Sequence, residues 1–405
     1  MAAPRVVVTG IGGLCCIGKN ATEIWQALRA GTCGIGPLTI HDKDDLKVAI
    51  AGEIAELPEH ELDKRQLMTM GRFGLLAVLA AGEALAQAGL KGEDRPAMNI
   101  GAIIGAGVYG GDAMEKAYRD VFRDGKKRAE IFTVPKAMPA SPSVQTSMVH
   151  GLKGPVLGVT SACSSSNHAI ATAYDMLRLG RADAIVAGGS EAPLSYGVLK
   201  AWESMRILAK TGCRPFSADR EGLVLGDGAG AIVMETLESA ERRGATILAE
   251  IAGAGLSADA GDIVSPSVEG PAAAIRACLA EAGLAPGDVD YINAHGTATS
   301  ANDRVETEAI RAVFSADADG ISVSSTKSMH AHCLGASGAL EAIACIGAIC
   351  NGVVPPTANY NEADPQCDLD VTPNTARERK VDVALSNAFA FGGANAVVAF
   401  KAFDA

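Results

Sequence analysis

Short apolar runs alternate along this chain with longer runs of helical period. The first apolar run, residues 5–9 (RVVVT), predicts a buried strand that ends in a glycine-rich turn, GIGGL. Residues 73–88 are apolar on nearly every side, which predicts a helix buried on both flanks and ended by Gly89. Residues 99–107 (NIGAIIGAG) predict the next strand. This alternation indicates an α/β fold with largely buried strands.

The same order of elements occurs twice. The segments AQAGL at 86–90 and AEAGL at 280–284 each follow an apolar helix and precede a polar turn and a strand, which in the second copy lies within 289–297 (VDYINAHGT). We therefore predict two similar halves, residues 1–242 and 243–405. A chain of 405 residues is long enough to form both.

The segment from Gly154 to Ile170, GPVLGVTSACSSSNHAI, predicts a strand, a tight turn and a helix, with Cys163 at the turn. A thiol at this place is expected to be exposed at the strand end. The first N–H groups of the helix and its dipole would favour the thiolate, which is the nucleophilic form. The alternative is that Cys163 is a small buried residue, as free cysteines often are.

Further polar residues follow predicted strands in the second half. They are His295, Lys327, His330, His332 and, in the next helix, Glu341. Each alone could be structural: a core or surface histidine, a solvated lysine, or its partner on a helix face. Because all of them follow strands, as Cys163 does, they could meet at one sheet edge, where ligand sites form.

Residues 385–400 (LSNAFAFGGANAVVAF) predict a hairpin whose turn includes Gly392 and Gly393. These glycines would let the backbone N–H near Phe391 face inward. An ordinary hairpin is the plain alternative.

The composition of the chain excludes some classes of function. A formal net charge of −12 argues against a nucleic-acid-binding protein and requires a local basic patch for any acidic partner. None of the ten cysteines has C-x-x-C spacing, which disfavours a zinc site, and the chain opens with no signal peptide, so we expect reduced thiols in the cytoplasm. We also expect no helix long and apolar enough to span a membrane.

One motif suggests a different ligand. GAGVYG at 105–110 matches G-x-G-x-x-G after a strand, which is the pattern of a dinucleotide site. That pattern should open the first βαβ unit of a domain, whereas this strand comes about a hundred residues into the chain.

A family resemblance rests on four segments: TSACSSS around Cys163, NAHGTATSAND around His295, SSTKSMHAHCLGASGALE around Lys327, His332 and Glu341, and NAFAFGGAN around Phe391. Together they resemble the β-ketoacyl-acyl carrier protein synthases of the synthase II type. The resemblance covers nearly the whole chain, including RPFSADREGLVLGDGAG at 214–230. VVTGIGGLC, MHAHCLGA, GVLKAWESMR and PPTANYNEADPQCDLDVTPN resemble a nodulation branch of that family, which elongates acyl chains for lipochitin-oligosaccharide signals. The resemblance implies a thiolase-like fold, with two similar halves in five αβαβα layers, and a homodimer.

The resemblance also implies a reaction, a decarboxylative Claisen condensation. Cys163 would take an acyl chain from its carrier-protein thioester, and malonyl-carrier protein would lose carbon dioxide to form an enolate. His295 and His332 would donate hydrogen bonds to the malonyl thioester oxygen. The backbone N–H groups of Cys163 and Phe391 would bind the tetrahedral oxyanion.

Other positions match supporting roles in the family. Lys327 and Glu341 would form a pair that supports the site electrostatically without a covalent part. Phe391 would gate the acyl tunnel. The remaining positions are Thr297 and Thr299 for the phosphopantetheine arm, and Val108 and Trp202 for the tunnel wall.

The implied partner is the acidic acyl carrier protein. Five basic residues match its usual docking positions: Lys64, Arg65, Lys127, Arg128 and Arg206. They would form the local patch that the net charge requires, although scattered solvated charges are the alternative. The resemblance implies no cofactor or metal on the enzyme, no nucleic acid and no membrane insertion.

The sequence departs from the family pattern at four places. Trp202 replaces a more usual phenylalanine, so chain-length preference cannot be transferred. Ala394 replaces a threonine after the Gly-Gly turn, which would remove a hydrogen bond at the gate. His330 is an additional histidine of open role, and Ser164 to Ser166 could tune the thiolate.

Two related readings compete. A degradative thiolase would need a second catalytic cysteine near the Gly-Gly turn, and NAFAFGGAN has none. A non-catalytic chain-length subunit of a polyketide-like pair would lack the nucleophile, whereas Cys163 is present.

Overall fold

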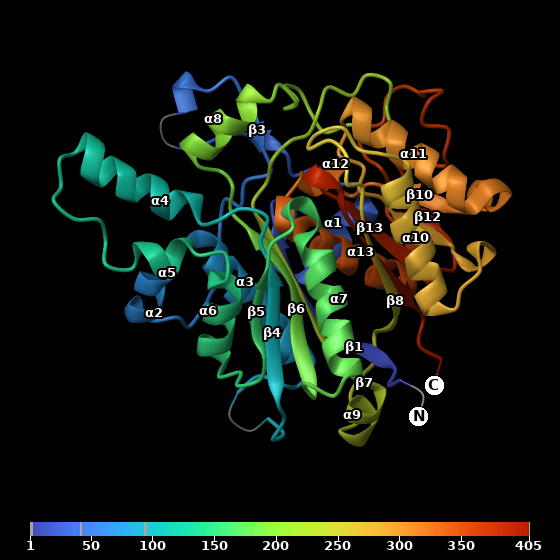
Figure 1. The fold of residues 1–405 in the computed structure, drawn as a ribbon, viewed down its shortest axis with the longest axis horizontal. Helices are drawn as coiled ribbons and strands as arrows, with labels where there is room; N and C mark the ends of the chain where they lie inside the picture. Colours follow the sequence, from blue (N-terminus) through green and yellow to red (C-terminus); the bar gives the residue numbers. More distant parts are fainter. Residues whose placement is uncertain (1–2, 41–42, 93–94, 405) are drawn as a thin grey trace.

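A computed structural model describes residues 3–40, 43–92 and 95–404, and its centre is a ten-stranded mixed sheet (Figure 1). The strand order is β10-β9-β13-β14-β8-β1-β7-β6-β4-β5. The strands are β1 Val6–Cys15, β4 Ile100–Gly105, β5 Val156–Val159, β6 Ala184–Glu191, β7 Gly228–Thr236, β8 Ala249–Ala258, β9 Tyr291–Asn293, β10 Ser322–Ser324, β13 Val383–Phe389 and β14 Ala394–Lys401. Two small pairs lie outside it: β2 Gly36–Pro37 with β3 Ile50–Ala51, and β11 Val353–Val354 with β12 Arg377–Glu378.

Helices cover both faces of this sheet. The helices are α1 Ala21–Ala30, α2 Lys64–Thr69, α3 Arg72–Gln87, α4 Gly111–Tyr118, α5 Thr133–Ala137, α6 Ser141–His150, α7 Ser165–Arg178, α8 Tyr196–Ser204, α9 Leu237–Arg242, α10 Glu269–Ala282, α11 Ser300–Phe314, α12 Lys327–His330 and α13 Ser337–Asn351.

The sheet consists of two five-strand sets with one topology. From the centre outward, each set has its first, fifth, fourth, second and third strand in chain order. In both sets the outer three strands run parallel, and the fifth strand is antiparallel to both neighbours. The sets join where Val6–Val8 of β1 pair with Ala249–Ile251 of β8. The repeated order of elements is therefore present, and the division after Arg242, between α9 and β8, stays a prediction.

The elements stack in five layers. α7 and α13 pack against each other, and each contacts strands of both sets, so they form a central helical layer. α3 packs on β1 and β7, while α10 packs on β8 and β14. The order helix, sheet, helix, sheet, helix agrees with the predicted α/β fold of two similar halves.

Strand β1 corrects one prediction. We expected a turn at GIGGL, but the strand continues through Leu14 to Cys15. A Cβ at Gly10 would lie 2.1 Å from the carbonyl oxygen of Ala84, so glycine lets α3 pack directly on the strand. On the opposite face, Gly13 lies against Ile343 of α13. These glycines serve close packing and do not form a turn.

The predicted helix at 73–88 is confirmed as α3, Arg72–Gln87, and Gly89 follows it with a φ of +68°. The expectation about membrane spans is wrong. The described residues contain one helical segment, Leu334–Asn351, that is long and apolar enough to cross a bilayer. In the fold 83% of it is buried, because α13 lies between the two sets of strands and therefore needs apolar side chains on every side.

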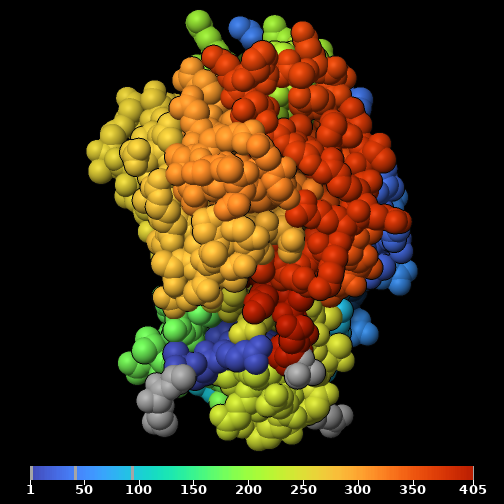
Figure 2. All heavy atoms as spheres, turned by 90° about the vertical axis from the view of Figure 1, so that its right-hand side faces the viewer, coloured from blue at the N-terminus to red at the C-terminus, as the bar shows by residue number. Residues whose placement is uncertain are grey.

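The two ends of the described chain lie side by side. The Arg5 guanidinium stacks 5.4 Å from the centre of the Phe403 ring, and Figure 2 shows the first and last segments next to each other at the lower end of the molecule. The start of α7 lies away from the two termini, near the middle of the molecule (Figure 1).

Candidate active site

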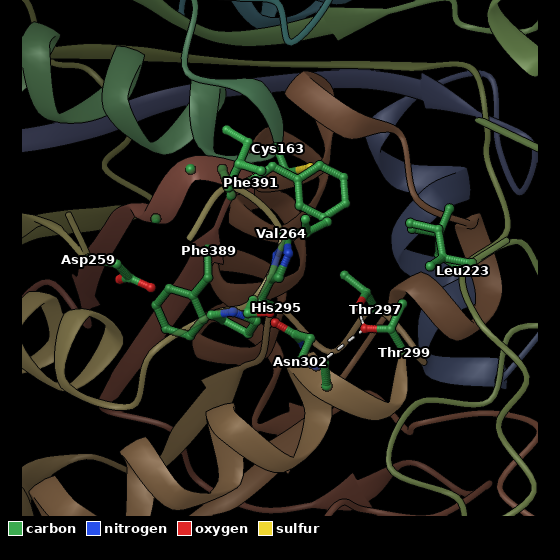
Figure 3. A pocket seen from close by; sticks show the side chains of 18 of the residues that line it. Cys163, Leu223, Asp259, Val264, His295, Thr297, Thr299, Asn302, Phe389 and Phe391 are labelled. Carbon is green, nitrogen blue, oxygen red and sulfur yellow. Dashed lines mark hydrogen bonds between the residues drawn. The ribbon is translucent and has the colours of Figure 1, made fainter. Parts of the chain in front are cut away.

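The predicted strand, turn and helix around Cys163 are confirmed. β5 leads through the turn Ala162–Ser164 into α7, and Ala162 has a left-handed φ of +50°. The predicted exposure of the thiol is wrong, because Cys163 is only 6% exposed. Loops from the second half cover it: His332 contacts the thiol, and Phe391 lines the same cavity. Figure 3 shows Phe391 beside Cys163.

Burial also reverses the predicted thiolate. Loss of solvation raises the pKa of Cys163 to about 12, although the positive charge of Lys327 acts in the opposite direction. The position at a helix N-terminus therefore does not ionise this thiol in the free protein. A base within reach must take its proton when it reacts.

His332 is the imidazole in contact with this thiol. Its Nε2 lies 3.2 Å from Cys163 Sγ, and its Nδ1 lies 2.9 Å from Ser337 Oγ at the start of α13. Its backbone N–H donates to Val224 O at 2.7 Å, so both the ring and the main chain are fixed. Burial, followed by the charge of Lys327, lowers the pKa of His332 well below its usual range, so the imidazole is neutral at pH 7.

His295 lies beside this pair, just after β9. The backbone N–H groups of His295 and Gly296 donate to the two carboxylate oxygens of Glu306 on α11, at 2.8 and 2.7 Å. The His295 ring meets the His332 ring edge to face, with centroids 5.6 Å apart. Burial lowers its pKa well below the ordinary value, and Lys327 adds to this effect.

Lys327 and Glu341 form a fully buried ion pair, in which Lys327 Nζ donates to Glu341 Oε1. Burial raises the pKa of Glu341, and Lys327 opposes that shift. The Lys327 charge lowers the pKa of Cys163 and of both histidines, and Glu341 acts in the opposite direction at Cys163.

Most of the remaining predicted residues line the cavity above Cys163. Thr297 and Thr299 share a hydrogen bond of 2.9 Å at its mouth, and Thr299 accepts from the Asn302 N–H (Figure 3). Trp202 stacks on Phe391, with ring centroids 5.9 Å apart. Both aromatic rings line the cavity. Val108 packs with Cys163 in one apolar cluster but is not part of the cavity wall.

The five predicted docking residues are exposed on three separate segments. Lys64 and Arg65 begin α2, Lys127 and Arg128 follow the helical segment after α4, and Arg206 follows α8. Arg206 has a left-handed φ of +58°.

The additional histidine, His330, lies outside the cavity wall. Its Nδ1 bonds the Ala331 carbonyl at 2.8 Å, and its Nε2 bonds Thr326 Oγ1 at 3.0 Å. Burial lowers its pKa to about 3, so it stays neutral. These contacts hold the turn that precedes His332.

The serine-rich turn does not act on the thiolate as the sequence suggested. Ser164 donates to the Ser161 carbonyl at 2.8 Å, and Ser165 donates to the Ala162 carbonyl at 2.6 Å. Ser166 donates to the Gly335 carbonyl. Ser164 and Ser165 therefore hold the backbone of the turn, and Ser166 ties it to the loop that carries His332.

The dinucleotide motif has another use. The N–H groups of Gly107 and Val108, which would have to meet a phosphate, donate to the Glu191 carboxylate. Because the Glu191 side chain already occupies these N–H groups, they are not available to a phosphate. In the described part of the chain, no group of three or more His, Cys, Asp or Glu side chains could hold a metal ion.

Sequence reasoning missed several residues of the site. Asn302 and Glu306 face the histidine from α11, and the i, i+4 spacing after Thr299 could have indicated them. Ser337 stands at the helix start after His332, where a hydroxyl often has a positioning role. The cavity-lining segment 262–266 gives no comparable signal.

Comparison with known proteins agrees with this geometry. Residues 3–240 match the model of the β-ketoacyl synthase N-terminal domain, and residues 248–361 match that of the C-terminal domain. The chain belongs to the β-ketoacyl synthase family, a class of acyltransferases.

Particular relatives refine the comparison. The chain is 62% identical over 397 residues to nodulation protein E of Rhizobium sp. (strain N33), covering 98% of this chain and 99% of the relative. It is 40% identical to 3-oxoacyl-[acyl-carrier-protein] synthase 2 of Staphylococcus aureus (strain N315), covering 99% of both. The solved AntDE:AntF complex, a type II PKS acyl-carrier protein with its ketosynthase, superposes with a TM-score of 0.91 at 29% identity and full coverage of both chains. The resemblance and the thiolase-like fold are thereby confirmed.

Proposed function

We propose that this enzyme elongates an acyl chain held on Cys163 by decarboxylative condensation with malonyl-carrier protein. The observation that carries the proposal is the 3.2 Å contact between Cys163 Sγ and His332 Nε2, with the His295 ring beside it in one cavity. A thiol, a neutral base and a second imidazole are the groups that the two chemical steps need.

Acyl transfer comes first. The Cys163 thiol proton moves to His332 Nε2 as the sulfur attacks the carbonyl carbon of the incoming thioester. The new C–S bond forms, the carrier C–S bond breaks, and the proton passes to the departing pantetheine sulfur. A thiol with a pKa of about 12 needs such a coupled transfer, because almost none of it is ionised at neutral pH.

Condensation follows. The malonyl unit loses carbon dioxide, and its enolate carbon attacks the acyl carbon on Cys163 while His295 and His332 donate hydrogen bonds to the enolate oxygen. The Ser337 hydroxyl can both donate and accept a hydrogen bond, so it supports either tautomer of His332. His332 Nε2 carries no proton when acyl transfer begins, and it carries one during condensation. The backbone N–H groups of Cys163 and Phe391 bind the oxyanion. The C–Sγ bond then breaks, and the thiol takes up a proton.

Substrate enters through the cavity mouth. Thr297 and Thr299 offer hydroxyls to the phosphopantetheine arm, and Phe391, stacked on Trp202, gates the tunnel toward Val108. The enzyme itself carries no cofactor, since both substrates arrive on the prosthetic arm of the carrier protein. The buried ion pair between Lys327 and Glu341 supports the site electrostatically and takes no covalent part.

The partners are an acyl carrier protein and a second copy of this chain. The docking residues are exposed basic side chains, as an acidic partner requires: Lys64, Arg65, Lys127, Arg128 and Arg206. The helices α4 and α5 project from the body beside the edge strand β5 (Figure 1). The segment from α4 to α5, residues 111–137, exposes Phe122, Ile131 and Val134 at 82%, 84% and 72%, and an apolar surface of this kind suits a homodimer.

The biological role follows the nodulation relatives. The product would be an acyl chain for nodulation-signal lipids, made in the cytoplasm by a chain that divides after Arg242 into two thiolase-like halves. The second candidate, a non-catalytic chain-length subunit, is disfavoured because Cys163 and both histidines are present in contact geometry.

Intact-mass spectrometry tests the proposal. The protein is mixed with a panel of acyl-carrier proteins beside Cys163→Ala, before and after malonyl-carrier protein is added. We expect one acyl mass on the native enzyme only, discharged as a β-ketoacyl product. If no chain loads on Cys163, the elongating function is wrong and a partner-dependent or non-catalytic role replaces it.

A further inference from the structure

One buried carboxylate near the nucleophile has no part in the reaction described so far. Glu191 ends β6 and is 1% exposed. Its Oε2 accepts from Gly107 N at 2.6 Å, from Gly335 N at 3.1 Å and from Val108 N at 3.3 Å. Among the described residues it forms no ion pair, so backbone N–H groups alone compensate its burial.

Those N–H groups belong to two loops on either side of Cys163. The first, residues 106–110, is called here the tunnel loop and carries Val108. The second, residues 325–336, is called the histidine loop and carries His332. Val108 and Leu334 both pack in the apolar cluster of Cys163, and the N–H groups of Val108 and of Gly335 meet the same carboxylate.

The two loops touch each other around this carboxylate. A Cβ at Gly335 would lie 2.1 Å from Gly107 N and 2.8 Å from Glu191 Oε2, and a Cβ at Gly107 would lie 2.9 Å from the Ala162 carbonyl oxygen. The two loops are therefore in direct backbone contact, with no room for a side chain between them.

Backbone strain supports the same view independently. Leu334 and Ala331 in the histidine loop, and Ala162 beside the thiol, have left-handed φ angles of +42°, +63° and +50°. Such conformations persist only where the surroundings hold them, and they cluster at sites that need exact geometry. The Gly335 N–H bond to Glu191 directly follows Leu334.

We propose that Glu191 is a positioning residue that couples Val108 to the loop carrying His332, so that an acyl chain pressing on Val108 shifts the catalytic base. This rests on the proposed function, because it assigns Val108 to the acyl tunnel. The enzyme would then discriminate chains by length in the rate of acyl transfer as well as in binding.

The titratable groups around Glu191 allow a second readout. Burial raises the pKa of Glu191 to about 8, and the facing Asp227 adds to this. Glu191, together with Glu341, raises the pKa of Cys163, whereas Lys327 lowers it. Above pH 8 an ionised Glu191 therefore disfavours the thiolate, and below pH 7 a neutral one has little effect.

The first experiment measures single-turnover acyl loading with octanoyl-carrier and palmitoyl-carrier protein. Glu191→Ala removes all three bonds, and the ratio of the two rates should change by roughly fivefold or more. Glu191→Gln keeps an acceptor oxygen for the glycine N–H groups and should restore the native ratio. Glu235→Ala is the matched control, because Glu235 is also buried but bonds Thr9, Ser239 and Arg243 on β7's far side.

Equal slowing of both chains by Glu191→Ala and Glu235→Ala would overturn the proposal. Alkylation of Cys163 by iodoacetamide gives a readout that needs no acyl transfer. Glu191→Gln should react roughly threefold faster than native protein above pH 8 and at the native rate below pH 7. The same rate ratio at every pH would contradict the assigned electrostatic contact.

Hydrogen exchange on the native protein covers the case in which Glu191→Ala does not fold. Cys163 is alkylated with N-dodecyl iodoacetamide to fill the cavity, with iodoacetamide as the short control. Protection of the peptides that span 105–110 and 332–337 should change together. A response in the first peptide alone overturns the coupling. If the native enzyme loads no acyl chain while both peptides respond, the proposed function fails and the coupling stands.

Discussion

The two halves contain the same strand, turn and helix at corresponding places, but with very different connections. In the first half, residues 160–164 join β5 to α7 and present a single reactive group, Cys163. In the second half, residues 325–336 join β10 to α13 and present both Lys327 and His332. The comparison teaches that the repeated frame fixes where the groups meet, while the length of the loop decides how many groups it can carry.

The two histidines give the sharpest test of this comparison. His332→Ala removes the base beside Cys163, so it should lower both acyl loading and condensation by roughly 10³-fold. His295→Ala removes only an enolate donor and should lower condensation by a similar factor while loading stays near the native rate. Single-turnover assays of each half-reaction measure both. Equal loss of acyl loading in the two variants would show that His295 and His332 do not have separate roles.

Variants of the Lys327–Glu341 ion pair test whether this pair stabilises the loop of residues 325–336. Lys327→Met leaves Glu341 buried without its partner and should lower the free energy of unfolding by about 3–5 kcal/mol. The double variant Lys327→Met with Glu341→Leu should recover much of that loss, because no charge stays buried. Denaturant titration measures this. The exposed pair Arg242 and Glu238 provides the control, and Arg242→Ala should change stability by less than about 1 kcal/mol.

The pH dependence of the thiol tests the short turn. Because burial raises the pKa of Cys163 to about 12, the thiolate fraction should keep rising between pH 7 and 9, by up to about tenfold for each pH unit. The rise should be shallower near pH 8, where Glu191 ionises. Iodoacetamide alkylation of Cys163, followed by peptide mass analysis, measures this slope. A plateau below pH 8 would mean that the helix N-terminus ionises the thiol after all.

The aromatic pair at the gate should give the smallest effect. Trp202→Phe keeps a ring against Phe391, but the smaller side chain enlarges the cavity. Loading rates should therefore change by roughly twofold to tenfold, in favour of longer chains. Competition between two acyl-carrier proteins in one reaction measures the preference. A uniform change for all chains would place Trp202 outside the chain-length determinant.

Part of this structure could be predicted from the local sequence pattern alone. The apolar run before Cys163, the small residues of its turn and the helical period after it define the nucleophile turn without any long-range contact. The hairpin around Gly392 and Gly393 is local in the same way, and both glycines have positive φ angles. The motifs around the two histidines also identified which residues meet.

The remaining features depend on contacts between distant segments. Burial of Cys163 is caused by loops that follow it by more than 150 residues, so its protonation could not be read from its own helix. Gly10 resembles a turn residue until α3 is known to lie against it. Glu191 has no motif at all, because its three partners are backbone N–H groups from two other loops.

The central helical layer has a consequence for synthesis of the protein on the ribosome. α13, at residues 337–351, covers the face of β1 at Gly13 through Ile343. That strand leaves the ribosome long before the helix exists. The part of the inner face that α13 contacts, on β1 and β7, therefore stays uncovered while most of the chain is made, whereas α7 already covers β4 and β6. We therefore expect the packing of this part of the first half to be completed only after translation is nearly finished.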